Sequence, residues 1–161
     1  MGTFLLKALL VLAAMAPADA HRWTLYMNPR FGTRLLYPAD MFGRGVESDN
    51  GDGITLRAPD GASLAIFGRW NIDRESPAGF VRTLTGSPEY RELRYRLVRP
   101  GFAVLSGNRG SRIFYERYVF AGRDGAVHGF VLEYPAARRA SWDSVAARLS
   151  ASLSWRPVTV R

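Results

Sequence analysis

Short segments of alternating apolar and polar residues, bounded by turn residues, recur along this chain of 161 residues. The clearest case is the pair of segments 54–58 and 64–69, which the turn Pro59-Asp60-Gly61 connects. Period-two alternation is typical of half-buried strands, and two strands joined by so short a turn must run antiparallel. The chain is therefore constrained to a fold in which neighbouring strands are joined by hairpins.

Further strands are predicted on both sides of this hairpin, because Gly, Asn, Asp and Pro clusters divide the rest of the chain in the same way. The predicted strands are 23–26, 33–37, 90–98, 102–106, 112–121 and 126–134. We also expect a single helical turn at 39–42 and a four-residue hairpin connection at Gly107-Asn108-Arg109-Gly110.

Two segments are predicted to be helical. Ser76-Pro77 opens the first, since serine is a favourable N-cap and proline fits the first turn. Ser141 is expected to cap the second, which follows the last strand. Their buried stripes are predicted to be Phe80, Val81 and Leu84 in the first helix and Trp142, Val145, Leu149 and Leu153 in the second.

This order of elements predicts an α+β fold, an antiparallel sheet of about seven to eight strands with two helices packed on it. Doubly wound parallel folds are disfavoured because they need a helix between nearly every pair of strands. No linker or low-complexity stretch divides the chain after residue 20, so we expect a single domain at 21–161.

Residues 1–20 have the pattern of a secretory signal peptide. Lys7 precedes the apolar run 8–16, and Ala18 and Ala20 are the small residues that a signal-peptidase site requires. The apolar run is shorter than the roughly 20 residues of a membrane span. We therefore expect cleavage after Ala20, a periplasmic or secreted protein and no transmembrane span, with an uncleaved anchor as the alternative.

The charged and sulfur-containing residues limit the possible partners. The chain has no cysteine, which excludes disulfides, thiolate metal sites and a lipoprotein anchor. Its formal net charge is +8, and every basic residue after Lys7 is an arginine. These arginines are scattered, so a generally basic surface is expected, and association with anionic envelope lipid or polysaccharide stays an alternative. Nucleic acid is not an expected partner outside the cytoplasm.

Candidate catalytic residues are few. His21 and His128 are the only histidines, and His128 lies on the apolar face of a predicted strand, where a core role is expected. Glu92, Glu116 and Glu133 lie in strands among arginines, which indicates ion pairs. An envelope hydrolase that uses His128 or a carboxylate pair is retained as an alternative function.

No metal site or cofactor is expected. The segment 48–53 has the composition of the start of a calcium loop, but the twelfth position of such a loop would be Pro59 instead of a glutamate. A structural turn is the simpler interpretation. There is also no Gly-x-Ser-x-Gly motif to place a nucleophile.

Aromatic residues alternate with arginines in the long strands of the second half. Arginine beside aromatic side chains on a sheet face suits the binding of planar or anionic groups. An ordinary sheet with one solvated face is the alternative. The candidate binding surface consists of Arg94, Arg96, Arg112, Tyr115 and Arg117.

Several motifs together carry a resemblance that covers most of the chain after residue 20. They are Tyr37-Pro38 with Phe42, Asn50-Gly51-Asp52-Gly53, Asp60-Gly61, Leu105-Ser106-Gly107, Ile113-Phe114-Tyr115 and Tyr134-Pro135. With them the chain resembles a family of small exported bacterial proteins of unknown function, and its element order resembles the PsbP-like α/β/α fold. The resemblance implies an adaptor that binds proteins or assists assembly rather than an enzyme. Our leading hypothesis is a non-catalytic, monomeric module that binds a protein or envelope component through one sheet face or its hairpin tips.

Overall fold

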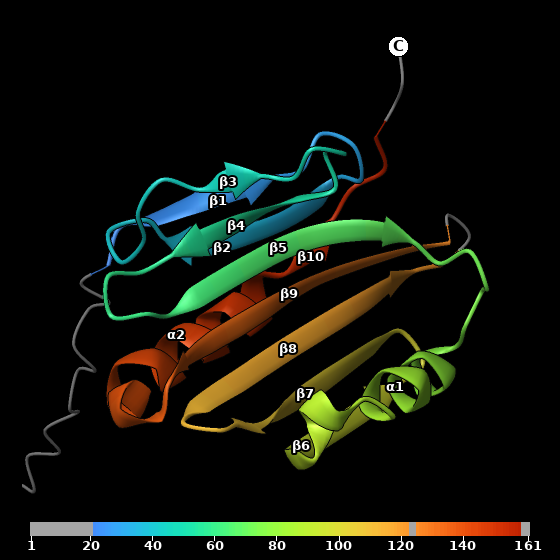
Figure 1. Ribbon diagram of the computed structural model, residues 1–161. Coiled ribbons are helices and arrows are strands. Elements are labelled where there is room, and N and C mark those ends of the chain that lie inside the picture. Colours follow the sequence, from blue (N-terminus) through green and yellow to red (C-terminus); the bar gives the residue numbers. More distant parts are fainter. Residues whose placement is uncertain (1–20, 123–124, 159–161) are drawn as a thin grey trace, which may run out of the picture.

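A computed structural model describes residues 21–122 and 125–158 of the protein (Figure 1). The predicted signal peptide, including Ala18 and Ala20, lies outside the described residues. Within the described part, no helix combines the length and apolar character that crossing a membrane requires.

Two antiparallel sheets form the body of the protein. The larger has seven strands in the order β3-β4-β5-β9-β8-β7-β6, and the smaller has the order β1-β2-β10. The strands of the larger sheet are β3 (Val46–Glu47), β4 (Gly53–Arg57), β5 (Ser63–Trp70), β6 (Glu92–Arg99), β7 (Phe102–Arg109), β8 (Arg112–Ala121) and β9 (Ala126–Pro135). Those of the smaller sheet are β1 (Trp23–Met27), β2 (Thr33–Pro38) and β10 (Ser154–Trp155).

The predicted α+β class, an antiparallel sheet with two helices, is confirmed. The predicted hairpin is also confirmed, as β4 pairs with β5. The first two predicted strands, however, do not join the main sheet. They pair with each other, and β2 also pairs with β10, a two-residue strand that the sequence pattern did not indicate.

The two faces of the large sheet are covered by different elements. On one face, helix α1 (Pro77–Thr85) packs against β6 and β7 (Figure 1). On the other face lie helix α2 (Arg139–Ser152) and the small sheet, which contact β8, β9 and β5. A hydrophobic core therefore lies on each face, the α1 core and the α2 core. Alternate side chains of β8 point into different cores, since Phe114 belongs to the α1 core while Tyr115 packs against the α2 core.

The predicted buried stripes of both helices are confirmed in the main. Trp142, Val145 and Leu149 of α2 are buried against the small sheet and β9, and Leu153 just after the helix is buried as well. In α1, Phe80 and Val81 are buried and Leu84 is half-buried.

The two helices begin differently. Ser76 caps α1 as predicted, and its hydroxyl accepts a hydrogen bond of 3.1 Å from the Gly79 amide. The predicted cap of α2 is wrong. That helix begins at Arg139, directly after the 3-10 turn η2 (Ala136–Arg138), so Ser141 lies inside its first turn and no side chain caps it.

Two predicted connections are also wrong. Gly107 to Arg109 are not a turn, because they pair with residues of β8, and only Gly110 and Ser111 connect the strands. Gly110 has a φ of 60°, which glycine tolerates best. The segment 39–42 contains a turn closed by the Met41 amide and the Pro38 carbonyl, not a helix.

Candidate functional site

His128 lies between the two sheets and is 1 % exposed. Its Nδ1 is 2.7 Å from the Thr33 hydroxyl, which donates its single proton to the Phe67 carbonyl. The His128 Nδ1–H is therefore the donor to Thr33. The imidazole also stacks on Trp155 at a centroid distance of 5.3 Å. These contacts favour a role for His128 in holding β2, β5 and β10 to β9.

A shallow pocket of about 430 Å³ borders the His128 ring. Its other described lining residues are arginine, aromatic and small apolar residues, with no carboxylate, serine, threonine or cysteine among them. A nucleophile and an orienting acid are both missing from that set, which disfavours triad chemistry there. The second histidine, His21, is placed elsewhere in an ion pair with Asp40 at 2.8 Å.

The carboxylates of Glu116 and Glu133 are joined by one guanidinium. Arg109 donates to Glu116 at 2.6 Å and also to Glu133, so the ion pairs predicted for these two glutamates are confirmed. The prediction is wrong for Glu92, which is exposed and has no ion pair with another described residue. Glu116 is 1 % exposed and accepts further hydrogen bonds from Tyr90 at 2.9 Å and Tyr118 at 2.7 Å. An arginine between the two acids occupies the place that a sugar and a water would need in a glycosidase.

The calcium-like segment is a turn, as expected. The Asp52 carboxylate accepts hydrogen bonds from Ser48 at 2.7 Å and from the Asn50 amide at 2.9 Å. The Ser48 hydroxyl is the main cause that lowers the pKa of Asp52. Within the described residues, no three or more His, Asp or Glu side chains gather closely enough to hold a metal ion.

The five residues of the predicted binding surface do not lie on one face. Arg96 and Arg112 belong to the face that α1 covers, whereas Tyr115 and Arg117 lie on the opposite face. Arg94 is the extra residue of a β-bulge at the edge of the sheet.

Three of these side chains already have partners within the protein. Arg112 donates to the Gly61 carbonyl at 2.9 Å and pairs with Glu133. Tyr115 donates to Ser150, and the Arg117 guanidinium lies 4.5 Å from the centre of the Phe102 ring.

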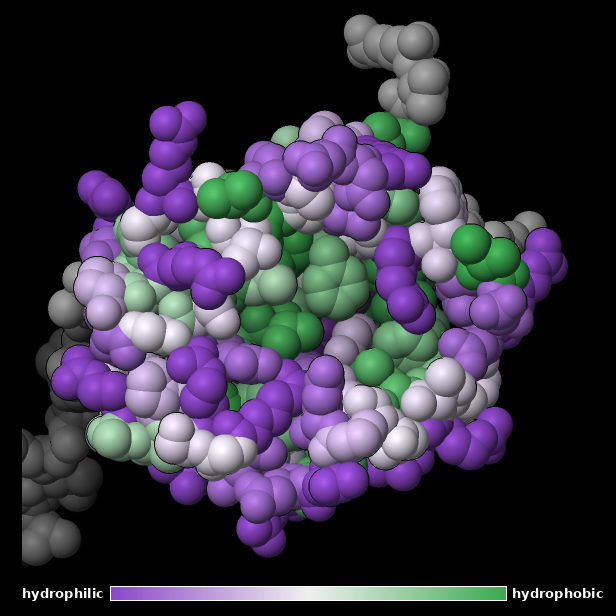
Figure 2. Space-filling model, viewed as in Figure 1, coloured by the Kyte–Doolittle hydropathy of each residue, from purple (hydrophilic) through white to green (hydrophobic). Residues whose placement is uncertain are grey.

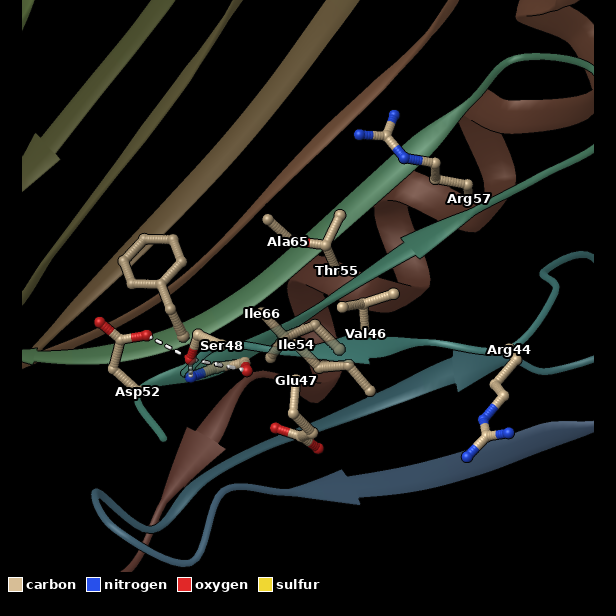
Figure 3. A pocket seen from close by; sticks show the side chains of 12 residues that line it. Arg44, Val46, Glu47, Ser48, Asp52, Ile54, Thr55, Arg57, Ala65 and Ile66 are labelled. Atoms are coloured by element: carbon tan, nitrogen blue, oxygen red, sulfur yellow. Dashed lines mark hydrogen bonds between the residues drawn. The ribbon is translucent and has the colours of Figure 1, made fainter. Parts of the chain in front are cut away.

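A cleft of about 520 Å³ lies instead over β3, β4 and β5, and we name it the β3–β5 cleft (Figure 3). A row of cross-strand partners crosses the sheet here, because Val46 pairs with Thr55, Thr55 with Ala65 and Ala65 with Val131 of β9. Partners in register point to the same face of a sheet. The α1 helix packs on β6 and β7, and its Phe80 also contacts Tyr118 and Phe120 of β8. It does not extend over the row of Val46, Thr55 and Ala65.

The surface view agrees with this arrangement. Figure 2 shows hydrophobic residues gathered across the middle of the face in view, with hydrophilic residues around them. Val46 is 71 % exposed, while Thr55, Ala65, Phe67 and Val131 are half-buried. The floor of the cleft is therefore apolar and reachable from solvent.

Charges of opposite sign line different ends of the cleft (Figure 3). Arg44 and Arg57 lie at one end, brought together by the hydrogen bond from the Gly43 amide to the Arg57 carbonyl. Among the described residues, neither guanidinium has an ion-pair partner. At the other end, Asp52 is bound as described above and Glu47 accepts a hydrogen bond from Tyr26.

This cleft was not predicted, because the alternating aromatic and arginine residues of the second half form the more prominent sequence pattern. A signal was present in β5, where Leu64, Ala65, Ile66 and Phe67 are all apolar. A strand with apolar residues on both faces is usually covered on both, either by other elements of the protein or by a binding partner.

No family model matches the sequence, and no curated protein is similar to it. Among solved structures, the solution structure of cyanobacterial PsbP (CyanoP) from Synechocystis sp. PCC 6803 superposes with a TM-score of 0.61. It is 16 % identical to this chain, and the match covers 90 % of this chain and 99 % of that one. At this identity the likeness establishes the fold alone, which is the PsbP-like α+β fold that the element order predicted.

Proposed function

We propose that this protein is an exported, non-catalytic binding module whose β3–β5 cleft holds an extended segment of a cell-envelope protein. The observation that carries the proposal is the mainly apolar row of Val46, Thr55, Ala65 and Val131, which lies open on a sheet face. Beside it lie Arg44 and Arg57, which have no ion-pair partner among the described residues. The signal-peptide pattern of residues 1–20 supports export.

The chemistry of the cleft favours binding over catalysis. Its lining contains no histidine, and Asp52 and Glu47 are both engaged in hydrogen bonds within the protein. Arg44 and Arg57 are left to pair with carboxylates of a bound segment, and charge-assisted pairs of this kind fix the orientation of a ligand. Apolar side chains of the segment would cover the floor.

Site-specific photocrosslinking in envelope extract tests the proposal. A benzophenone amino acid replaces Val46 in the cleft or, as control, the 84 % exposed Ile72 outside it. We expect a discrete protein adduct from position 46 only, and its loss in the Arg44→Gln/Arg57→Gln variant. No adduct at position 46, or equal adducts at both positions, would overturn the proposal.

Binding to anionic lipid or polysaccharide of the envelope is a second candidate function, favoured by the net charge of +8. It predicts sedimentation with anionic phospholipid vesicles that weakens steeply as salt is raised. Because the arginines are spread over the surface, the Arg44→Gln/Arg57→Gln variant would keep most of this binding.

Export and oligomeric state are part of the proposal. We expect the protein from the cell envelope to begin at His21 and to be a monomer. N-terminal sequencing and sedimentation of the purified protein measure both, and an intact Met1 would contradict cleavage.

A further inference from the structure

Strand β6 is the outer edge of the large sheet, at its lower margin in Figure 1. Its inner side pairs with β7 at every residue except Arg94, whereas no described strand pairs with its outer side. The bulge at Arg94 interrupts the regular edge, so the continuous part is the five-residue segment from Tyr95 to Arg99. An edge of this kind presents main-chain donors and acceptors to an added strand.

The exposed side chains along this edge are mostly cationic. Arg94, Arg96 and Arg99 are all exposed, and none has an ion-pair partner in the described part of the chain. Tyr95 beside them is 50 % exposed. Arg99 donates a hydrogen bond of 3.1 Å to the Val98 carbonyl, so its charge is hydrogen-bonded but not neutralised. A carboxylate-bearing partner would therefore find three guanidinium groups here without a counter-charge.

The arginines lie on both faces of the sheet. Arg96 is opposite Leu105, on the face that α1 covers, whereas Arg99 is opposite Phe102 on the other face. A membrane or other flat anionic surface would meet cations on one face only. Cations on both faces instead suit an extended segment that lies in the plane of the sheet beside β6, because such a segment has side chains on both faces.

A second copy of this chain does not fit the edge. Pairing two β6 strands would bring the arginines of both copies together, and like charges on adjacent strands are destabilising. The same repulsion does not act on an acidic strand.

We propose that β6 accepts an acidic extended segment of another protein as an additional outer strand. Residues of the segment opposite Arg96 and Arg99 would be acidic, and the residue opposite half-buried Leu97 would be apolar. The two acidic residues are then three positions apart, which puts their side chains on opposite faces of the added strand. This site is separate from the β3–β5 cleft.

Two fluorescent peptides of identical composition test the proposal with the purified protein. In the first, two glutamates stand three positions apart in a Val/Thr background, and in the second they stand two positions apart and share a face. We expect fluorescence anisotropy to show binding of the first peptide, and binding about fivefold weaker for the second, since one of two ion pairs is lost or strained.

Variants separate this edge from the cleft. Arg96→Gln/Arg99→Gln is expected to weaken binding of the first peptide about fivefold or more, while Arg44→Gln/Arg57→Gln leaves it unchanged. Hydrogen exchange should show new protection of amides within 95–99 when the first peptide binds.

Other outcomes overturn the proposal. No binding of either peptide would mean that the arginines and the bulge only keep the edge from aggregating. Equal binding of both peptides would mean a non-specific charge effect. Binding of anionic vesicles that Arg96→Gln/Arg99→Gln abolishes, without peptide binding, would assign the edge to a membrane surface.

Discussion

At the scale of single residues, the most demanding position is Glu116. A buried carboxylate is costly unless donors surround it, and here two tyrosine hydroxyls and the Arg109 guanidinium donate to it. Arg109 is held in turn by the ring of Phe114, 4.2 Å from its guanidinium carbon. Removing any of these groups therefore takes a hydrogen bond from a buried partner, although Arg109 keeps a second carboxylate in Glu133.

Removing one of these interacting side chains should destabilise the protein, because the buried groups that remain lose a hydrogen-bond partner. Glu116→Gln is expected to lower the free energy of unfolding by about 1.5–3 kcal/mol, because Arg109 and two tyrosine hydroxyls lose a charged acceptor while Arg109 stays paired with Glu133. Tyr118→Phe removes one hydrogen bond to a charged group and should cost about 1.5–3 kcal/mol. Urea unfolding measures both, with exposed Glu89→Gln as the control. Equal, small effects for all three variants would contradict a coupled network.

Asp60 provides a pH-dependent contribution to stability. Burial alone would raise the pKa of this carboxyl, but hydrogen bonds from Trp142 and the Ala62 amide, with Arg138 nearby, outweigh burial and lower the pKa. A carboxyl with a lowered pKa in the folded state stabilises the protein above its unfolded pKa of about 4. This contribution to stability is lost as the pH falls through the pKa that Asp60 has in the folded state.

Asp60→Asn should therefore lower the free energy of unfolding by about 1–2 kcal/mol at neutral pH. The difference from the natural protein should narrow below about pH 4, because protonated Asp60 resembles asparagine. Thermal or urea unfolding across this pH range measures the difference. A constant difference at every pH would show that the carboxylate charge contributes nothing.

At the scale of elements, the two helices test how far capping rules apply. Ser76 satisfies an amide at the start of α1, whereas Ser141 lies within the first turn of α2. The start of α2 is held by its neighbours instead, because Trp142 and Val145 are buried in the core directly after it.

Ser76→Ala should thus cost about 1 kcal/mol, while Ser141→Ala should be neutral or slightly stabilising. Equilibrium unfolding of the two variants measures this matched pair. A loss at Ser141 as large as that at Ser76 would mean that serine caps both helices, as local sequence rules predict.

The approach of β6 to β7 depends on a residue without a side chain. A Cβ on Gly107 would lie 2.3 Å from the Glu92 carbonyl oxygen and 2.9 Å from the Leu93 Cα, both backbone atoms. Gly107→Ala should therefore displace β6 and cost about 1–3 kcal/mol. Gly101→Ala is the matched control, since its Cβ would meet nothing within 4 Å. Hydrogen exchange of β6 and urea unfolding test both variants, and equal stability would contradict the tight approach.

At the scale of the whole molecule, buried tyrosines are distributed over both cores. Burial raises the pKa of Tyr26 in the small sheet to about 12. Burial also raises the pKa of Tyr90 and Tyr118 in the α1 core and of Tyr134 in the α2 core, and a neighbouring carboxylate adds to each shift. Alkaline pH therefore acts on every layer at once.

An unfolded tyrosine ionises near pH ~10, so above this pH the unfolded state loses protons that the folded state keeps. The contribution of these tyrosines to the free energy of unfolding is fully present below that pH, and it declines as the pH rises further. We expect at least four of the seven tyrosines to ionise only in the step in which the fold is lost. Tyrosinate absorbance and far-ultraviolet circular dichroism, recorded together, measure this. Ionisation of all seven with an unchanged circular dichroism spectrum would contradict it.

Local sequence was sufficient for the strands and helices whose pattern repeats over several residues. The 54–58 and 64–69 hairpin, the Ser76 cap and the Trp142, Val145 and Leu149 stripe all follow from periodicity and turn chemistry, which act between near neighbours. From this pattern the sequence also predicted the α+β class and the ion pairs of Glu116 and Glu133. It did not indicate β3 or β10, since a two-residue strand exists only through its partner.

The candidate sites depended on tertiary structure. Periodicity shows which residues of β5 and β6 can be buried, but not which element covers each face. Only the packed molecule placed α1 over β6 and β7, and so left Val46, Thr55 and Ala65 open beside Arg44 and Arg57. Strand order likewise put Arg96 and Arg99 at an edge, because pairing between distant segments is decided by long-range contacts that a linear pattern does not encode.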